Sequence, residues 1–314
     1  MNAAPGWTLG RTLLNSPALG GNVANQLSSL EFNTSNGWGN YNSVFASIST
    51  KDWHGLTMQS NFTWGRSLGT GSVVQATSSF TLPNPWDPGW AYGPQPFDVK
   101  FVYNLVMLYQ SPFFKSQQGF LGHVLGGWAI APIFTARTGF PLEIDVATGS
   151  NTDAQAFGEV YGNGNGSNEN AIGIAPYTGG NSAVYGVAPT SGCGINSNPS
   201  RGGSGINLFS DPNAVCNEFR RPVLGIDTSQ SGAGVLRTLP TWNLDATISK
   251  DIRATEHIGA TLIFQFTNLL NHFQAATPAL NIDSPTSWGA ITGQYTYPNG
   301  AVARAMEFGL RIHF

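Results

Sequence analysis

Several residue types capable of catalysis occur in the sequence, but they do not form a recognisable catalytic or metal-binding pattern. Histidines that bind zinc commonly recur at short, regular spacings. The five histidines here show neither HxH nor HxxxH spacing and are scattered: His54, His123, His257, His272 and His313. The GxSxG elbow of a serine hydrolase is also missing from the sequence. We therefore expect no enzyme activity, no cofactor and no metal site.

The two cysteines are a second potential source of chemistry. Cys193 and Cys216 lie in one stretch rich in glycine and asparagine, and they do not form a CxxC motif. A redox or metal role is therefore not indicated. A disulfide that closes a surface loop in an oxidising compartment is the plausible alternative.

The composition describes the scaffold that must hold these residues. Charged residues make up only 10% of the 314 residues, and aromatic residues make up 12%. No window has the roughly 18 apolar residues that a membrane helix needs. The net charge of −3 offers no electrostatic basis for binding nucleic acid. Low charge with many aromatic, glycine and asparagine residues favours an all-β protein, and a transmembrane barrel in particular.

The last ten residues, AMEFGLRIHF, alternate between apolar and small or ionisable side chains. Such period-two alternation predicts a strand with one apolar and one polar face. Six further runs show a similar pattern, and each is about 10–14 residues long, close to the length that crosses a bilayer. The seven predicted strands are Tyr41–Thr50, Leu56–Arg66, Phe97–Gln110, Val124–Arg137, Trp242–Ile252, His257–Leu270 and Ala301–Phe314.

The connections between these runs alternate between short and long. Long connections follow Arg66, Arg137 and Leu270. In an antiparallel sheet this alternation places all long connections at one end, as in bacterial outer-membrane barrels with short periplasmic turns and long extracellular loops. Residues 1–40 are interpreted as an extracellular loop or partial strand, residues 41–314 as the transmembrane barrel segment, and residues 147–240 as one long extracellular loop. A secreted β-sandwich, with its apolar face against a second sheet, is the alternative fold.

Aromatic residues near the ends of the predicted strands fit two structural roles. Trp64, Tyr109, Trp128 and Trp242 could form the girdles that barrels place at the two membrane interfaces. They could instead pack in the core of a sandwich. We favour the girdle because several of them lie at the ends of their runs. On the opposite face, polar side chains would point into the barrel lumen: Asp245, Gln265, Glu307 and Arg311.

Several stretches together resemble the C-terminal part of TonB-dependent outer-membrane receptors. The resemblance is to the large type with a carboxypeptidase-regulatory-like N-terminal domain. It covers most of residues 39–144 and 241–314, in the order found in the family. The stretches are GNYNSVFASIST, HGLTMQSNFTWGRSL, PFDVKFVYNLVMLY, GGWAIAPIFTARTGFPLEI, TWNLDATISKDI, ATLIFQFTNLLNHFQ and FGLRIHF.

The resemblance implies a location in the bacterial outer membrane and a role in energy-coupled uptake. It also implies that Phe308, Leu310, Ile312 and Phe314 form the C-terminal signal read by the barrel-assembly machinery. Such receptors have barrels of about 22 strands with a plug inside. The seven or eight strands expected here, the eighth from Trp7–Leu14, would be an incomplete part of such a barrel. The plug and the segment that contacts TonB would then belong to a missing N-terminal part.

Three functions remain open at this point. The first is the barrel segment of an uptake receptor, with outer-membrane lipid as its surroundings and an unidentified small molecule, glycan or peptide as its substrate. The second is an independent small barrel that displays an adhesive or structural surface loop. The third, a barrel hydrolase with a rim cluster of Ser or Asp and His, ranks last.

Overall fold

The computed structural model describes most of the strands and part of the loops. The described residues are 37–70, 89, 92–142, 144–146, 169–170, 172–173, 191–203, 205–220, 234–253, 255, 258–295 and 303–314. The possible strand at Trp7–Leu14 lies outside these residues. Among the helices in the described ranges, none has both the length and the apolar composition needed to cross a membrane.

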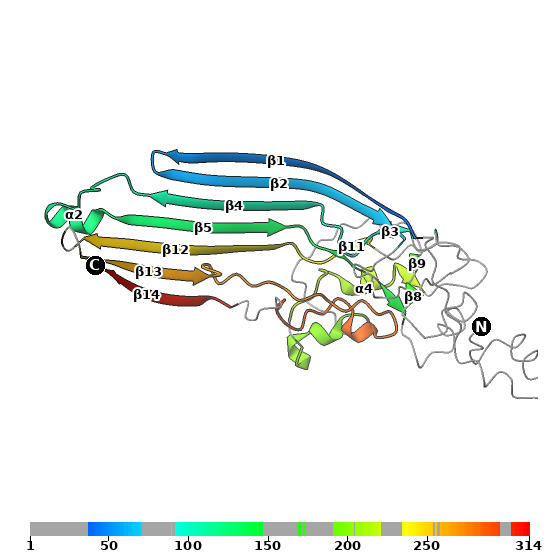
Figure 1. Cartoon of the computed structure of the whole chain (residues 1–314). Coiled ribbons are helices and arrows are strands. Elements are labelled where there is room, and N and C mark those ends of the chain that lie inside the picture. Colours follow the sequence, from blue (N-terminus) through cyan, green and yellow to red (C-terminus); the bar gives the residue numbers. More distant parts are fainter. Residues whose placement is uncertain are drawn as a thin grey trace, which may run out of the picture.

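Seven long strands form one antiparallel sheet whose spatial order follows the chain order (Figure 1). A two-residue strand, β3, pairs with the last residues of β2. The strands of this sheet are β1 (Gly39–Trp53), β2 (Leu56–Gly69), β3 (Gly93–Pro94), β4 (Phe101–Gln110), β5 (Trp128–Arg137), β12 (Thr241–Arg253), β13 (Gly259–Thr267) and β14 (Ala305–His313). The prediction of an all-β antiparallel fold is therefore confirmed.

The strand register gathers the predicted apolar residues on one face of the sheet. Phe264 of β13, for example, lies between Ile248 of β12 and Phe308 of β14. Side chains of a strand alternate between faces, so one such row fixes the others. This apolar face comprises Val44, Ala46, Ile48, Met58, Phe62, Trp64, Phe101, Tyr103, Leu105, Met107, Tyr109, Trp128, Ile130, Phe134, Trp242, Leu244, Ala246, Ile248, Leu262, Phe264, Phe266, Met306, Phe308, Leu310 and Ile312.

The opposite face of the sheet is largely polar. Its hydroxyl, amide and charged side chains include Ser47, Gln59, Asn61, Thr63, Asn104, Thr135, Asn243, Asp245, Thr247, Thr261, Gln265, Glu307 and Arg311. An outer-membrane barrel turns its apolar face to lipid and its polar face to the lumen. The two faces of this sheet have the chemistry that this arrangement requires.

Short and long connections lie at opposite ends of the sheet, as predicted (Figure 1). The turns β1–β2, β4–β5 and β12–β13 share one end with the C-terminus, which in an outer-membrane barrel is the periplasmic end. The three long connections share the other, extracellular end. Helix α2 (Gly119–Leu125) lies within the β4–β5 turn.

Four strands begin later than predicted, β4, β5, β13 and β14, and for β4 and β5 the shift has a local cause. The strand predicted from Val124 begins at Trp128, because the chain first forms α2 and then turns through Gly127 at a φ of 71°. The strand predicted from Phe97 begins at Phe101, because Asp98 is engaged in a buried ion pair with Arg237.

The extracellular connections form a small folded unit with its own core. The connections β5–β12 and β13–β14 supply the residues of this loop cap. Its core residues are Leu142, Ile144, Cys193, Leu208, Phe209, Cys216, Phe219, Leu236, Leu280 and Trp288. Its elements are β6 (Pro141–Leu142), β7 (Asp145–Val146), β8 (Glu169–Asn170), β9 (Ile172–Gly173), β10 (Phe219–Arg220), β11 (Leu236–Arg237), η4 (Ile195–Ser197), η5 (Pro199–Arg201), α4 (Pro212–Cys216) and η6 (Pro285–Ser287).

Asn207 joins the two connections at the centre of the loop cap. Its buried side chain donates to the Trp288 carbonyl at 2.8 Å and accepts from the Phe209 N–H at 2.9 Å. Backbone bonds run alongside, including Leu208 N–H to Gly289 O at 2.8 Å. A buried amide is stable only when hydrogen-bonded, so these partners fix where the two connections meet.

The arrangement does not match the β-sandwich alternative. In the described part of the chain, the remaining sheets are two-stranded pairs within the extracellular connections, β6–β11, β7–β8 and β9–β10. The side chains of the apolar face remain open to the surroundings; Phe308, for example, is 66% exposed. The face is therefore available to lipid rather than covered by a second large sheet.

Candidate functional site on the polar face and at the extracellular end

A row of uncharged polar residues crosses five strands on the polar face. The register pairs Asn61 of β2 with Asn104 of β4, and Thr135 of β5 with Asn243 of β12. Ser47 completes the row and donates its hydroxyl to Asn61 Oδ1 at 2.7 Å. Amide and hydroxyl groups both donate and accept hydrogen bonds. The row can therefore bind polar groups presented from the lumen.

Asn243 has unused hydrogen-bonding capacity in this row. Its Nδ2 donates to Asp245 Oδ1 at 2.8 Å. Its Oδ1 is buried and has no hydrogen-bond partner among the described residues. A buried acceptor without a partner costs about 1–3 kcal/mol. A group that donates a hydrogen bond to Asn243 Oδ1 would recover that free energy.

The side chains predicted to face the lumen all lie on the polar face. Gln265 of β13 pairs with Glu307 of β14 in the register, and Arg311 pairs with Thr261. Thr261 in turn donates its hydroxyl to Asp251 Oδ1 at 3.2 Å. Hydrogen-bonding groups thus continue along the polar face from the extracellular to the periplasmic half.

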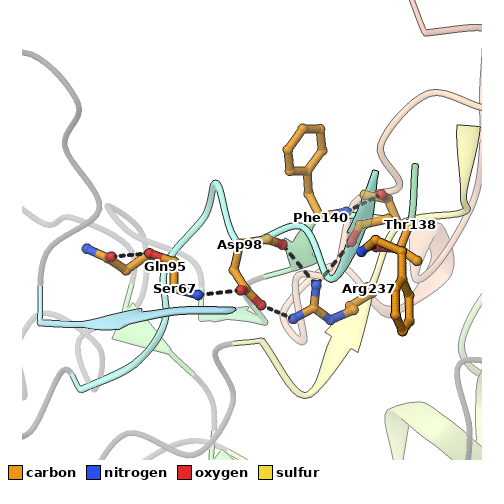
Figure 2. A network of polar contacts seen from close by, with 9 residues as sticks. Ser67, Gln95, Asp98, Thr138, Phe140 and Arg237 are labelled. Carbon is orange, nitrogen blue, oxygen red and sulfur yellow. Dashed lines mark hydrogen bonds and ion pairs between the residues drawn. The ribbon is translucent and has the colours of Figure 1, made fainter. Parts of the chain in front are cut away.

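A buried ion pair closes the extracellular end of the sheet. Asp98 and Arg237 form a hydrogen-bonded ion pair, and their side chains are 0% and 13% exposed, respectively. Arg237 also donates to the carbonyls of Asp98, at 2.9 Å, and Gly139, at 3.1 Å. Asp98 accepts the Ser67 N–H at 2.7 Å, as Figure 2 shows.

This network joins three separate parts of the chain at the rim. Asp98 belongs to the β2–β4 connection, Arg237 to the end of the β5–β12 connection, and Ser67 to β2. A buried charge is tolerated only when it is paired and hydrogen-bonded, and the carbonyls that accept from Arg237 meet that need. The pair therefore fixes the base of the loop cap on the sheet.

A shallow apolar depression lies beside this network. Its volume is about 380 Å³, and its lining includes Pro96, Phe97, Phe140, Pro141 and Leu142. Thr238 and Thr277 are the polar residues of its lining. Apolar walls with a few polar groups are typical of ligand contacts. The depression is one place where a solute could contact the extracellular rim.

The four predicted interfacial aromatics lie on the apolar face at two levels. Trp64 and Trp242 lie towards the extracellular ends of β2 and β12, whereas Tyr109 and Trp128 lie at the periplasmic ends of β4 and β5. Interfacial girdles would require two such levels on one face, and the girdle assignment stays a prediction.

His272 stacks on Trp242 with 3.9 Å between the ring centroids. It lies in the β13–β14 connection, outside the strands. Burial disfavours the charged imidazolium and lowers the pKa of His272 below its usual value. The neutral ring therefore extends the aromatic surface of Trp242.

The predicted assembly-signal residues lie on an edge strand. Phe308, Leu310 and Ile312 project from the apolar face of β14, and all three are exposed. Phe314 follows directly after β14 and is almost fully exposed. Within the described residues, β14 pairs with β13 and leaves its other edge open. Recognition by the assembly machinery stays a prediction.

The two cysteines form a disulfide in the loop cap. Cys193 and Cys216 are bonded, with their Cα atoms 6.3 Å apart. Cys216 ends helix α4, and Asp211 caps that helix by accepting the Ala214 N–H at 3.0 Å. Among the described residues, no group of three or more His, Cys, Asp or Glu side chains is placed to hold a metal ion.

Sequence reasoning missed three residues that organise the ends of the sheet. Asp98 and Arg237 are far apart in sequence, so their pairing leaves no local pattern. Lys250 did leave a signal, because it falls in the apolar register after Ala246 and Ile248. A charge at an apolar position suggests a specific partner, and Lys250 has three carbonyl acceptors.

Comparison with known proteins agrees with the chemistry of the two faces. The family model described as "Outer membrane beta barrel domain" matches residues 1–307. Searches against curated proteins and against solved structures found no significant match. The family match covers nearly the whole chain, and it agrees with a long-stranded antiparallel sheet that has one apolar and one polar face. The chain belongs to the outer membrane beta barrel domain family, and its place is the bacterial outer membrane.

Proposed function

We propose that this chain forms the C-terminal strands of a TonB-dependent outer-membrane receptor and takes part in energy-coupled uptake. The observation that carries the proposal is the polar row Ser47–Asn61–Asn104–Thr135–Asn243, which lines one face of a sheet whose other face is suited to lipid. Such a row gives a lumen wall that can hydrogen-bond with a plug or a passing solute. The role is one of transport, with no catalytic step.

Two unpaired edges support a barrel larger than the described sheet. Within the described residues, the outer edges of β1 and β14 have no neighbouring strand. Unpaired backbone groups are not tolerated in lipid, so further strands must complete the sheet. The resemblance to large receptors accounts for such strands, and for a plug and a TonB-contacting segment outside this chain.

The chemistry of the polar row favours an uncharged polar solute. Its members are amides and hydroxyls, which match the hydroxyls of sugars and the peptide groups of short peptides. The extracellular rim adds apolar contacts near Phe97 and Phe140. We therefore propose a glycan or a peptide as the substrate. The rim and the loop cap would meet it first.

Direct contact with TonB tests the proposal without knowledge of the substrate. The full-length protein, purified from outer membranes, would be mixed with the periplasmic domain of TonB and cross-linked. A specific cross-linked pair is expected. In intact cells, accumulation of fluorescent oligosaccharides and peptides should fall to background after a protonophore is added. No TonB contact, or accumulation insensitive to the protonophore, would contradict the proposal.

One observation favours the alternative of a surface-display protein. The loop cap has its own core and a disulfide, as expected of a unit that keeps its shape outside the membrane. An adhesive barrel would bind its target at the cell surface without an energy requirement. The same protonophore experiment separates the two functions, because surface binding would persist while uptake would stop.

A further inference from the structure

The β4–β5 turn exposes an unusual amount of apolar surface at the periplasmic end. Phe120 and Leu121 of helix α2 are 82% and 63% exposed. Four more apolar side chains in the turn are also exposed: Phe113, Phe114, Val124 and Leu125. A contiguous exposed apolar patch of this kind marks a contact with a partner or a membrane.

Two residues of the apolar face hold α2 on the lipid side of the sheet. Lys250 Nζ donates to the carbonyls of His123, at 2.6 Å, and Gly126. Trp128 Nε1 donates to the Val124 carbonyl at 2.9 Å. Trp128 and Lys250 are register partners on the apolar face, and the Lys250 ammonium lies 5.2 Å from the centre of the Trp128 ring. The C-terminal end of α2 therefore lies on the face that contacts lipid.

The base of the turn is fixed to β12, so the patch has a defined direction. Gln117 is 3% exposed, donates to the Asp251 carbonyl at 2.8 Å and accepts the Arg253 N–H at 3.0 Å. Gly127 approaches the Asp251 backbone so closely that an added Cβ would lie 2.3 Å from its oxygen. These contacts hold α2 in one orientation.

We propose that the turn between β4 and β5 is an interfacial anchor that inserts its apolar side chains into the periplasmic leaflet of the outer membrane. The patch is continuous with the lipid-facing surface through Trp128, which singles out lipid as its occupant. Short apolar segments bind the headgroup and acyl boundary in this way. The exposed Lys115 can reach phosphate groups at that boundary, as long basic side chains do at interfaces.

This inference rests on the outer-membrane barrel fold and is independent of the proposed transport. The anchor would fix the depth and tilt of the sheet at its periplasmic end, where Tyr109 and Trp128 form the aromatic level. A soluble periplasmic protein that covers the same patch is the competing outcome, and the test below distinguishes it from lipid.

Site-specific fluorescence tests the anchor in the full-length protein. Phe120→Cys and Leu121→Cys place a single reactive thiol on the patch, and Ser116→Cys and Gln118→Cys place one on exposed polar positions of the same turn as matched controls. The native cysteines remain in their disulfide and do not react with the label. Each variant is labelled with an environment-sensitive dye and reconstituted in phosphatidylethanolamine–phosphatidylglycerol vesicles.

Quenchers placed at known depths read the position of each label. We expect lipids with a shallow nitroxide to quench labels at 120 and 121 several-fold more than labels at 116 and 118, and aqueous iodide to give the opposite order. Equal quenching at all four sites, or stronger iodide quenching at 120 and 121, would overturn the proposal. Protection from both quenchers in native membranes, with iodide access in vesicles, would assign the patch to a protein partner instead. Heat-modifiable gel mobility confirms that each variant is folded.

Discussion

The membrane sheet and the loop cap use the same kinds of apolar side chain in opposite ways. In the sheet, Phe308 and Ile48 are 66% and 69% exposed, whereas in the loop cap Trp288 and Leu208 are 0% exposed. The hydrophobic effect demands removal from water in both regions. The cap meets that demand with its own side chains, and the sheet meets it with lipid. The same chain therefore removes apolar side chains from water in two ways, by packing them together in the loop cap and by contact with lipid in the sheet.

The two regions also differ in how they use charge. The rim beneath the loop cap buries Asp98 and Arg237 as a pair, each with additional hydrogen bonds. The central part of the apolar face instead carries aliphatic and aromatic side chains, and Lys250 lies near its periplasmic border with its charge directed to backbone carbonyls. Substitutions that move charge or remove a polar partner should therefore act differently in the two regions.

The largest expected effect comes from breaking the buried ion pair. Arg237→Met leaves the Asp98 carboxylate buried without its cation, which costs about 3–5 kcal/mol. We expect limited proteolysis to cleave the extracellular connections much faster, while the folded sheet keeps its heat-modifiable mobility. Arg201→Met, at an exposed arginine of the loop cap, serves as the control and should leave the cleavage rate unchanged. Equal cleavage of the two variants would show that the pair does not hold the cap.

A charge in the middle of the apolar face should have the next largest effect. Phe264→Arg places a guanidinium against lipid and should destabilise the folded barrel by about 2–4 kcal/mol. Gln265→Arg, one residue away on the polar face, should change stability by less than about 1 kcal/mol. Urea titrations of refolding into vesicles give both values. Similar losses for the two variants would remove the distinction between the faces.

Removal of the polar centre of the loop cap should have a smaller effect. Asn207→Ala leaves the Phe209 N–H and the Trp288 carbonyl without their buried partner, which costs about 1–3 kcal/mol. Hydrogen exchange should speed up in the cap and stay unchanged in β12 and β13. Asn196→Ala, at an exposed asparagine, is the matched control. Faster exchange throughout the sheet would mean that the two regions are not independent.

The smallest expected effect is a pH dependence at the extracellular aromatic level. The pKa of His272 is lowered by burial, so the unfolded chain binds a proton more readily than the folded one. The stability contribution of the neutral ring is complete above the usual pKa of about 6.5 and is lost as the pH falls from there through the lower folded-state pKa. Stability measured between pH 8 and pH 4 should decline more in the native protein than in His272→Phe. Parallel pH profiles for the native protein and His272→Phe would show that His272 does not cause the pH dependence.

The sheet could be predicted from the sequence because its determinants are local. Period-two alternation within one strand, as in Leu262, Phe264 and Phe266, identifies both the strand and its faces without knowledge of the neighbours. The alternation of short and long connections then gives the topology. The limits of two strands were misplaced where glycines or a distant ion pair decide the local conformation, as at Gly127 and Asp98.

The loop cap and the anchor could not be predicted in the same way. Asn207 and Trp288 meet across 81 positions, and Asp98 and Arg237 across 139. Contacts between residues so far apart in the sequence leave no periodic pattern in it. The segment before Trp128 has apolar residues at spacings that suit either a helix or a strand, so the sequence alone predicts that the strand extends over α2. Its identity as a helix depends on Lys250, Gln117 and other tertiary partners.

The contact of the apolar face with lipid is tested most directly by the accessibility of successive positions along β13. Spin labels at each residue from Thr261 to Phe266 would be exposed in turn to oxygen, which concentrates in lipid, and to a water-soluble nickel complex. If the apolar face contacts lipid, accessibility should have a period of two, with oxygen favoured at Leu262, Phe264 and Phe266 and nickel favoured at the alternate positions wherever water reaches the lumen. Accessibility that is uniform along the strand, or oxygen favoured at Thr261 and Gln265, would contradict the assignment of the apolar face to lipid.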